Sequence, residues 1–188
     1  MSNLLVQNIK HTNSTTAISV GTDGNVSFPV SFQIQQWQLL SNQGSNDTVL
    51  TDWGESTITS QANAKAGSAM TVSSGQFTFP QTGLYRVVFN MMAQTGSSAG
   101  QDNYIVVQME LSTDSGSNFT MIKQLISGGA ANMASGNYGD MLVNITNTST
   151  HKVDFRTSSI GSGSIILGNS ASSHAQSTAT FQRLGNSQ

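Results

Sequence analysis

The sequence lacks cysteine altogether, which excludes disulfide scaffolds, cysteine-ligated zinc and thiol catalysis. Charge is also scarce: 9% of the 188 residues are charged and the net charge is −2, whereas about 25% are charged in an average soluble domain. Seven Lys and Arg spread over the chain do not form the basic footprint that nucleic-acid phosphates require. No apolar run approaches the roughly 18 residues of a membrane span, and no signal peptide is expected.

The chain is instead rich in uncharged polar residues. Serine (29), threonine (20), asparagine (16) and glutamine (16) together make up 81 of the 188 residues. Glycine is frequent (18) and proline is rare (2). We therefore expect a sheet protein whose surface is hydrated by hydroxyls and amides rather than by charge.

Apolar residues alternate with polar ones along several segments, which predicts half-buried strands and no helix. In the segment 84–91, for example, the odd-numbered residues form one apolar face. Segment 32–39 changes phase at Gln35-Gln36, which predicts a bulge or a corner. Loops of small residues are expected at 96–100, 128–138 and 161–164. The other strands are predicted at 104–111, 141–145, 152–156, 165–167 and 179–181.

Residues 1–29 form a separate region that ends at Phe28-Pro29. Turn residues 22–25 separate two short apolar stretches, which indicates a β-hairpin. The apolar residues of this region are too few for a core, because an isolated hairpin is marginally stable. We therefore expect an arm over 1–29 that packs on another surface and a main domain over 30–188, although a first sheet of the main domain is the alternative. The candidate anchoring residues are Leu4, Leu5, Val6, Ile9, Ile18 and Val20.

The segment 75–85 carries the pattern G-x-F-x-x-P-x-x-G-x-Y, with Gly75, Phe77, Pro80, Gly83 and Tyr85 at the specified positions. This pattern resembles the signature of the complement C1q and tumour-necrosis-factor-like jelly roll. The strand order over roughly 30–185 resembles that family too. The resemblance implies an all-β, C1q/TNF-like antiparallel jelly-roll sandwich, preceded here by a short β-hairpin arm.

The arm carries a second resemblance. Its segments 3–9, 17–20 and 23–29 are similar to the leaders of tailed-phage virion proteins, especially fibre-like ones. This resemblance implies a bacteriophage particle, with synthesis in the host cytoplasm and location on the virion surface. Other virion proteins, such as major capsid or tail proteins, would then be its partners.

The C1q-like family packs three protomers about an axis, so the resemblance also implies a homotrimer. Apolar residues on a strand face that should be hydrated are candidate trimer contacts. Leu84, Val88 and Leu142 lie out of phase with the buried faces of their strands. The alternative is that they lie under a loop or in a sheet covered on both sides.

A hairpin turn is predicted at 112–119, where Asp114 would accept backbone N–H groups and Gly116 would take an unusual dihedral angle. The less favoured alternative is a calcium site of Asp114 with Asp102 or Asp140. Segment 96–100 spells G-x-S-x-G but lacks the following helix of a nucleophile elbow. The three histidines are widely spaced. We expect no enzyme activity, cofactor or metal.

The favoured function is a structural protein of the particle surface, either a capsid decoration (cement) protein or a short fibre knob. The alternative is a receptor-binding knob that recognises a host surface glycan. Exposed aromatic rings favour sugar binding, and Trp53 in its turn-like segment is the leading candidate, ahead of Trp37, Tyr104 and Tyr138. The alternative for Trp53 is a core or interface position.

Overall fold

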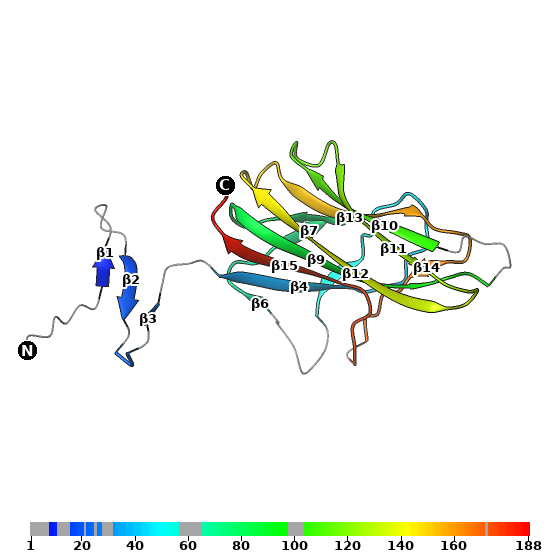
Figure 1. Cartoon of the computed structure of the whole chain (residues 1–188), viewed down its shortest axis with the longest axis horizontal. Coiled ribbons are helices and arrows are strands. Elements are labelled where there is room, and N and C mark those ends of the chain that lie inside the picture. The colour runs from blue at the N-terminus through cyan, green and yellow to red at the C-terminus, as the bar shows by residue number, and fades with distance from the viewer. Residues whose placement is uncertain are drawn as a thin grey trace, which may run out of the picture. The chain divides into compact units, whose positions relative to one another are not determined.

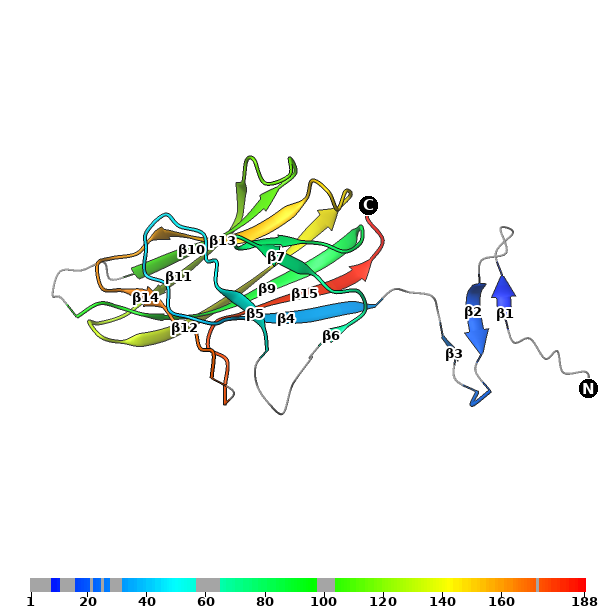
Figure 2. The same ribbon diagram turned by 180° about the vertical axis from the view of Figure 1, so that it is seen from behind.

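The computed structural model describes residues 8–10, 16–20, 22–24, 26–27, 32–56, 65–97, 104–171 and 173–188. These residues fall into two compact units, residues 1–31 and 32–188. All regular elements among the described residues are strands, shown in Figures 1 and 2. No helix capable of spanning a membrane is found in these ranges.

The first unit holds a three-stranded antiparallel sheet in the order β1-β2-β3. Its strands are β1 (Asn8–Lys10), β2 (Thr16–Val20) and β3 (Val26–Ser27). Val20 pairs with Val26 across the turn at 22–24, where a hairpin was predicted. Gly24 in this turn has φ +80°.

The second unit is a sandwich of a seven-stranded and a five-stranded antiparallel sheet. The larger sheet runs in the order β12-β9-β15-β4-β5, with β14 beside β9 and β6 beside β4. Its strands are β4 (Gln33–Leu39), β5 (Trp53–Glu55), β6 (Lys65–Ala66), β9 (Gly83–Gln94), β12 (Ala134–Ile145), β14 (Ile165–Ile166) and β15 (Thr178–Gly185).

The smaller sheet runs in the order β11-β10-β13-β8-β7. Its strands are β7 (Thr71–Ser73), β8 (Gln76–Thr78), β10 (Tyr104–Ser112), β11 (Thr120–Gly128) and β13 (Lys152–Ser159). Within each sheet, neighbouring strands are often distant in sequence. The connections between strands therefore cross from one sheet to the other, as Figures 1 and 2 show. This arrangement is the antiparallel jelly-roll sandwich that the resemblance of segment 75–85 implied.

The core lies between the two sheets and is dominated by aromatic rings. Phe77 of the small sheet packs 4.7 Å from Phe181 of the large one, measured between ring centroids. Phe89 and Phe155 meet across the sandwich at 4.5 Å. Offset and edge-to-face pairs of this kind stabilise a core beyond the area that they bury. The predicted inward residues of β9, Tyr85, Val87, Phe89 and Met91, are all buried.

The predicted bulge at Gln35-Gln36 is wrong. β4 pairs with β15 in unbroken register from Gln33 to Gln38, so the odd-numbered residues all face inward. Two of them are buried glutamines that satisfy core polar groups. Gln33 accepts a hydrogen bond from the Tyr85 hydroxyl at 3.0 Å, and Gln35 accepts one from the Met70 backbone N–H at 2.7 Å. The apolar alternation of segment 32–39 wrongly indicated a change of phase because these two inward residues are polar.

The loop predicted at 128–138 is also shorter than expected. β12 begins at Ala134 and pairs with the end of β9, so that Ala134 lies opposite Gln94 and Tyr138 opposite Asn90. The small residues of this segment carry no apolar alternation. Backbone hydrogen bonds to β9 therefore extend the strand where side-chain pattern did not indicate one.

Candidate functional site: an exposed sheet face and a polar loop pocket

The motif at 75–85 builds the core beneath the large sheet. Phe77 and Tyr85 are fully buried. Burial raises the pKa of Tyr85 to about 12, and its hydroxyl donates a hydrogen bond to Gln33 or to the Gln81 carbonyl oxygen. Gly75 has φ +79°, and a Cβ there would clash with the Leu50 carbonyl oxygen. A side chain at Gly83 would likewise lie 2.5 Å from Arg183 Nε, while Pro80 separates β8 from β9.

The outward face of the large sheet, which we call the seven-strand face, carries apolar side chains that the sandwich core leaves uncovered. The candidate contact residues lie here: Leu84 and Val88 are half-buried and Leu142 is exposed, and the β9–β12 register puts them on one side. Three other exposed residues on or beside strands of the large sheet, Phe32, Tyr138 and Leu184, were not predicted as contacts, and Tyr138 was considered only as a ring that could stack on a sugar. Together with Leu142 they are 47 to 66% exposed.

Charge is nearly absent from the seven-strand face. Its one described ion pair joins Arg86 Nε and Asp140 Oδ2, which are 2.7 Å apart. The two side chains are 44% and 43% exposed. The neighbouring strands place neutral groups beside it, where Gln36 donates a hydrogen bond to the Thr180 hydroxyl at 3.3 Å. A face of this composition loses little hydration of charged groups when another surface covers it.

A hollow also interrupts the seven-strand face between β9 and β12. It encloses about 310 Å³ and is bordered by Asn90, Met92, Tyr138 and Gln176, among others. The absence of a side chain at Gly136 contributes to it, because a Cβ there would come within 3.2 Å of the Met92 sulfur. The face is therefore uneven as well as apolar.

The structure confirms the alternative for Trp53, a position in the core, and not its role as a ring that stacks on a ligand. Trp53 is 6% exposed and packs within 5.5 to 6.0 Å of Phe77, Phe89 and Phe155. Its indole N–H donates to the Leu50 carbonyl oxygen at 2.7 Å. Both the ring faces and the N–H are thus used inside the core. Of the other aromatic candidates, Trp37 is buried, whereas Tyr104 and Tyr138 are exposed.

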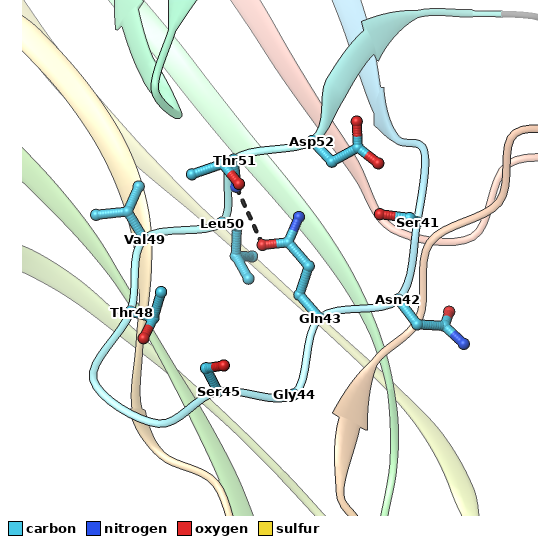
Figure 3. Close-up of a pocket in the computed structure, with 10 residues that line it drawn as sticks. All are labelled: Ser41, Asn42, Gln43, Gly44, Ser45, Thr48, Val49, Leu50, Thr51 and Asp52. Atoms are coloured by element: carbon cyan, nitrogen blue, oxygen red, sulfur yellow. Dashed lines mark hydrogen bonds between the residues drawn. The ribbon is translucent and has the colours of Figure 1, made fainter.

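A polar pocket lies directly before Trp53, within the loop that joins β4 to β5 (Figure 3). It encloses about 340 Å³. Gln43 extends across the loop, and its Oε1 accepts a hydrogen bond from the Thr51 backbone N–H at 3.1 Å. Sequence reasoning did not find this pocket, because it arises from a loop with no motif. Its lining residues are Ser41, Asn42, Gln43, Gly44, Ser45, Thr48, Val49, Leu50, Thr51 and Asp52.

The outward face of the small sheet holds a buried acidic pair that the sequence analysis also missed. Asp154 and Glu110 lie opposite each other on β13 and β10 and are 0% and 7% exposed. No N–H or O–H of the described residues donates to the Asp154 carboxylate. Burial, and then the charge of Glu110, raise the pKa of Asp154 to about 7. Arg156 binds Glu110 at 3.2 Å.

At the predicted turn, Asp114 accepts hydrogen bonds from the backbone and side chain of Asn118, at 2.9 and 2.6 Å. These bonds, together with one from the Ser112 hydroxyl, lower the pKa of Asp114 to about 2. Gly116 has φ +88°. Asp114 therefore serves to shape the hairpin. Asp102, a suggested calcium ligand, lies outside the described residues.

The other residues that the sequence offered as metal ligands or catalytic groups do not form a site among the described residues. Within the ranges that the structure describes, no three acidic or histidine side chains converge on a point that could hold a metal ion. His151 lies beside Thr146 and Thr150, and His174 beside Asn169. Only the start of the G-x-S-x-G segment is described.

The candidate anchoring residues belong to the first unit. Leu4, Leu5 and Val6 lie outside the described residues. Ile9 and Ile18 are paired across β1 and β2 in the backbone register. Val20 is one of the exposed large apolar residues of the chain.

No protein-family model and no curated protein sequence matches the chain. Solved structures do match in fold. The structure of Eiger TNF from S. frugiperda aligns with a TM-score of 0.63 and 10% identity, over 84% of this chain and 96% of that one. Murine APRIL aligns with TM-scores of 0.56 at pH 5.0 and 0.54 at pH 8.0, each at 8% identity over 81% of this chain and 99% of that one. The chain therefore has a TNF-like jelly-roll fold.

Proposed function

We propose that the chain forms a homotrimer through the seven-strand face and serves as a noncatalytic structural protein on the surface of a bacteriophage particle. The observation that carries the trimer is the set of exposed apolar residues on one face of a TNF-like jelly roll. Contiguous exposed apolar surface marks interaction sites in soluble proteins. The C1q/TNF resemblance of segment 75–85 supports three as the number of copies.

Two features support the particle as the location. Residues 1–31 form a compact unit of their own, as an anchoring arm requires, and their sequence is similar to virion-protein leaders. The low charge and the abundance of hydroxyl and amide side chains fit a surface protein of a particle. In this proposal residues 1–29 bind a capsid or tail protein and residues 30–188 project from it.

The first test is the solution mass by light scattering of the full chain and of a chain that begins at residue 32. The proposal predicts three times 19.8 kDa for the full chain and a trimer that survives truncation, because the seven-strand face lies wholly in the second unit. A monomer in both cases would contradict it. A trimer that dissociates on truncation would move the assembly contacts into the arm.

The second test concerns the particle. Tailed-phage particles that encode this chain are purified and labelled with gold-conjugated antibody against the jelly roll, then imaged by electron microscopy. The proposal predicts label at regular positions on the head or the tail. Particles made without the chain should take up the recombinant full chain but not residues 30–188. Absence of the protein from purified particles would contradict a structural role.

A further inference from the structure

The loop between β4 and β5 is held rigidly at both flanks. Gln43 exchanges two backbone hydrogen bonds with Ile166, at 3.0 and 2.8 Å. The Leu50 N–H donates a hydrogen bond to the Phe155 carbonyl oxygen at 2.8 Å. The Leu40 N–H donates to the Asp52 carbonyl oxygen, also at 2.8 Å, and so joins the two ends of the loop. The pocket inside this loop is therefore preformed, so a ligand would bind without first ordering it.

The lining is polar and almost uncharged. Seven of its ten residues carry hydroxyl, amide or carboxylate side chains, and none is Lys, Arg or His. The single charge, Asp52, would repel phosphate, sulfate or a sugar acid. Neither the Asp52 carboxylate nor the Thr51 hydroxyl has a hydrogen-bond partner within the described part of the chain. The pocket thus offers both donors and acceptors to a neutral polar molecule.

The side-chain amide of Gln43 has a buried N–H group without a hydrogen-bond acceptor in the described ranges of the chain. Its Oε1 is bound to Thr51 N–H, but its Nε2 is buried and has no partner among the described residues. Buried polar groups are almost always hydrogen-bonded. Figure 3 shows the amide in the middle of the loop, with the Ser41 hydroxyl turned toward it. Because Nε2 is closed off from solvent, a small shift of the Gln43 side chain is needed before an oxygen atom in the pocket can complete this amide.

We propose that the pocket of loop 41–52 binds a neutral saccharide. One sugar hydroxyl oxygen accepts the hydrogen bond from Gln43 Nε2, and other hydroxyls donate to Asp52 and bond to Thr51. Its volume of about 340 Å³ lies at the lower end of ligand pockets, which suits one sugar ring. The site replaces the one expected at Trp53, and it is independent of the trimer, because its residues lie off the seven-strand face.

The test is saturation-transfer NMR of the full chain with methyl glycosides of glucose, galactose and mannose and with N-acetylglucosamine, and N-acetylneuraminic acid as the anionic comparison. At least one neutral sugar should bind and the anionic one should not. Gln43→Glu keeps the acceptor for Thr51 N–H and removes the donor, and Thr51→Val removes one hydroxyl. Each should weaken binding roughly fivefold to tenfold, as the loss of one hydrogen bond does.

Thr120→Val is the matched control, since Thr120 is exposed on β11, outside the pocket, and it should leave binding unchanged. The oligomer mass of each variant checks its folding. If Gln43→Glu fails to assemble as the parent does, Thr51→Val alone decides. The proposal is overturned if no neutral sugar binds, if the anionic sugar binds as well as a neutral one, or if both pocket variants retain the parent affinity.

Discussion

The outward faces of the two sheets of the sandwich differ, although their inward faces are alike. On the small sheet, β10 and β13 turn Glu110, Lys152, Asp154 and Arg156 outward. On the large sheet, β9 and β12 turn mainly apolar and neutral side chains outward. The inward side chains of both sheets pack in the core of the chain, whereas the outward side chains contact solvent or another molecule. The small sheet carries a buried acidic pair together with the exposed residues Tyr104, Met121 and Ile126, whereas the large sheet carries mainly apolar and neutral surface.

The largest expected effect comes from putting charge on each face in turn. Leu142 and Ile126 are exposed to similar extents, 56% and 52%, on opposite sheets. Leu142→Glu should abolish the trimer, because a buried unpaired carboxylate at an interface is strongly unfavourable. Ile126→Glu should leave the trimer intact. Light scattering over a range of concentrations measures both, and equal behaviour of the two variants would contradict the assignment of the interface.

The next effect concerns Asp154 on the small sheet. Its pKa rises from 3.8 to about 7 on folding, so the folded state holds the proton more tightly than the unfolded state. The contribution of Asp154 to stability is therefore most favourable below about pH 4, declines as the pH rises toward about 7, and is level above that. Asp154→Asn should stabilise the protein at pH 8, by up to about 4 kcal/mol from the pKa difference, and should have little effect at pH 4.

Denaturant unfolding at fixed protein concentration tests this, because assembly makes stability depend on concentration. Asp52→Asn provides the control. Asp52 is an exposed carboxylate, and its substitution should change stability little at either pH. A parent protein whose stability does not change between pH 4 and pH 8 would contradict the buried acidic pair.

A smaller effect separates the two ion pairs. Arg156 is 30% exposed beside a Glu110 that is 10% exposed, whereas Arg86 and Asp140 are more exposed. Arg156→Met should cost about 2 kcal/mol at pH 8, since it leaves Glu110 and Asp154 without a cation. Arg86→Met should cost less than about 1 kcal/mol. Urea unfolding measures the difference, and a larger cost at Arg86 would reverse the comparison.

The smallest effect is a titration rather than a change of stability. The fully exposed Asp114 has its pKa lowered to about 2 by Asn118 and Ser112. Its turn is therefore most stable above the ordinary aspartate pKa and weakens as the pH falls toward about 2. Asn118→Ala should move the pKa upward, measured by NMR of the side-chain carboxyl carbon. Thr113→Ala in the same turn is the control and should leave it in place.

Much of the sandwich was predictable because alternation of period two reports directly on burial. Tyr85, Val87 and Phe89 face the core as the pattern indicated. Alternation does not report burial where the inward residue is polar, as at Gln33 and Gln35, because their hydrogen-bond partners Tyr85 and Met70 are distant in sequence. It failed in the opposite way at Asp154, which alternates with Val153 and Phe155 and is therefore expected to be hydrated, yet is buried on the outward side of the sheet.

The candidate surfaces were predictable only in part. Leu84, Val88 and Leu142 stood out because they break the alternation of their strands. Phe32, Tyr138 and Leu184 did not, since their position on the same face depends on which strands become neighbours. Trp53 was misassigned because its turn-like sequence carries no sign of the aromatic rings that enclose it.

The amino-acid sequence alone determined an all-β protein of low charge without cysteine chemistry, a separate N-terminal segment, and a jelly-roll signature. Those properties follow from composition and from local alternation, which each residue expresses whatever its distant neighbours. Only the tertiary structure decided that Trp53 lies in the core, that Asp154 is buried beside Glu110, and that the loop 41–52 encloses a pocket around Gln43. These outcomes depend on contacts between residues far apart in the chain, and such contacts exist only once the two sheets have closed on each other.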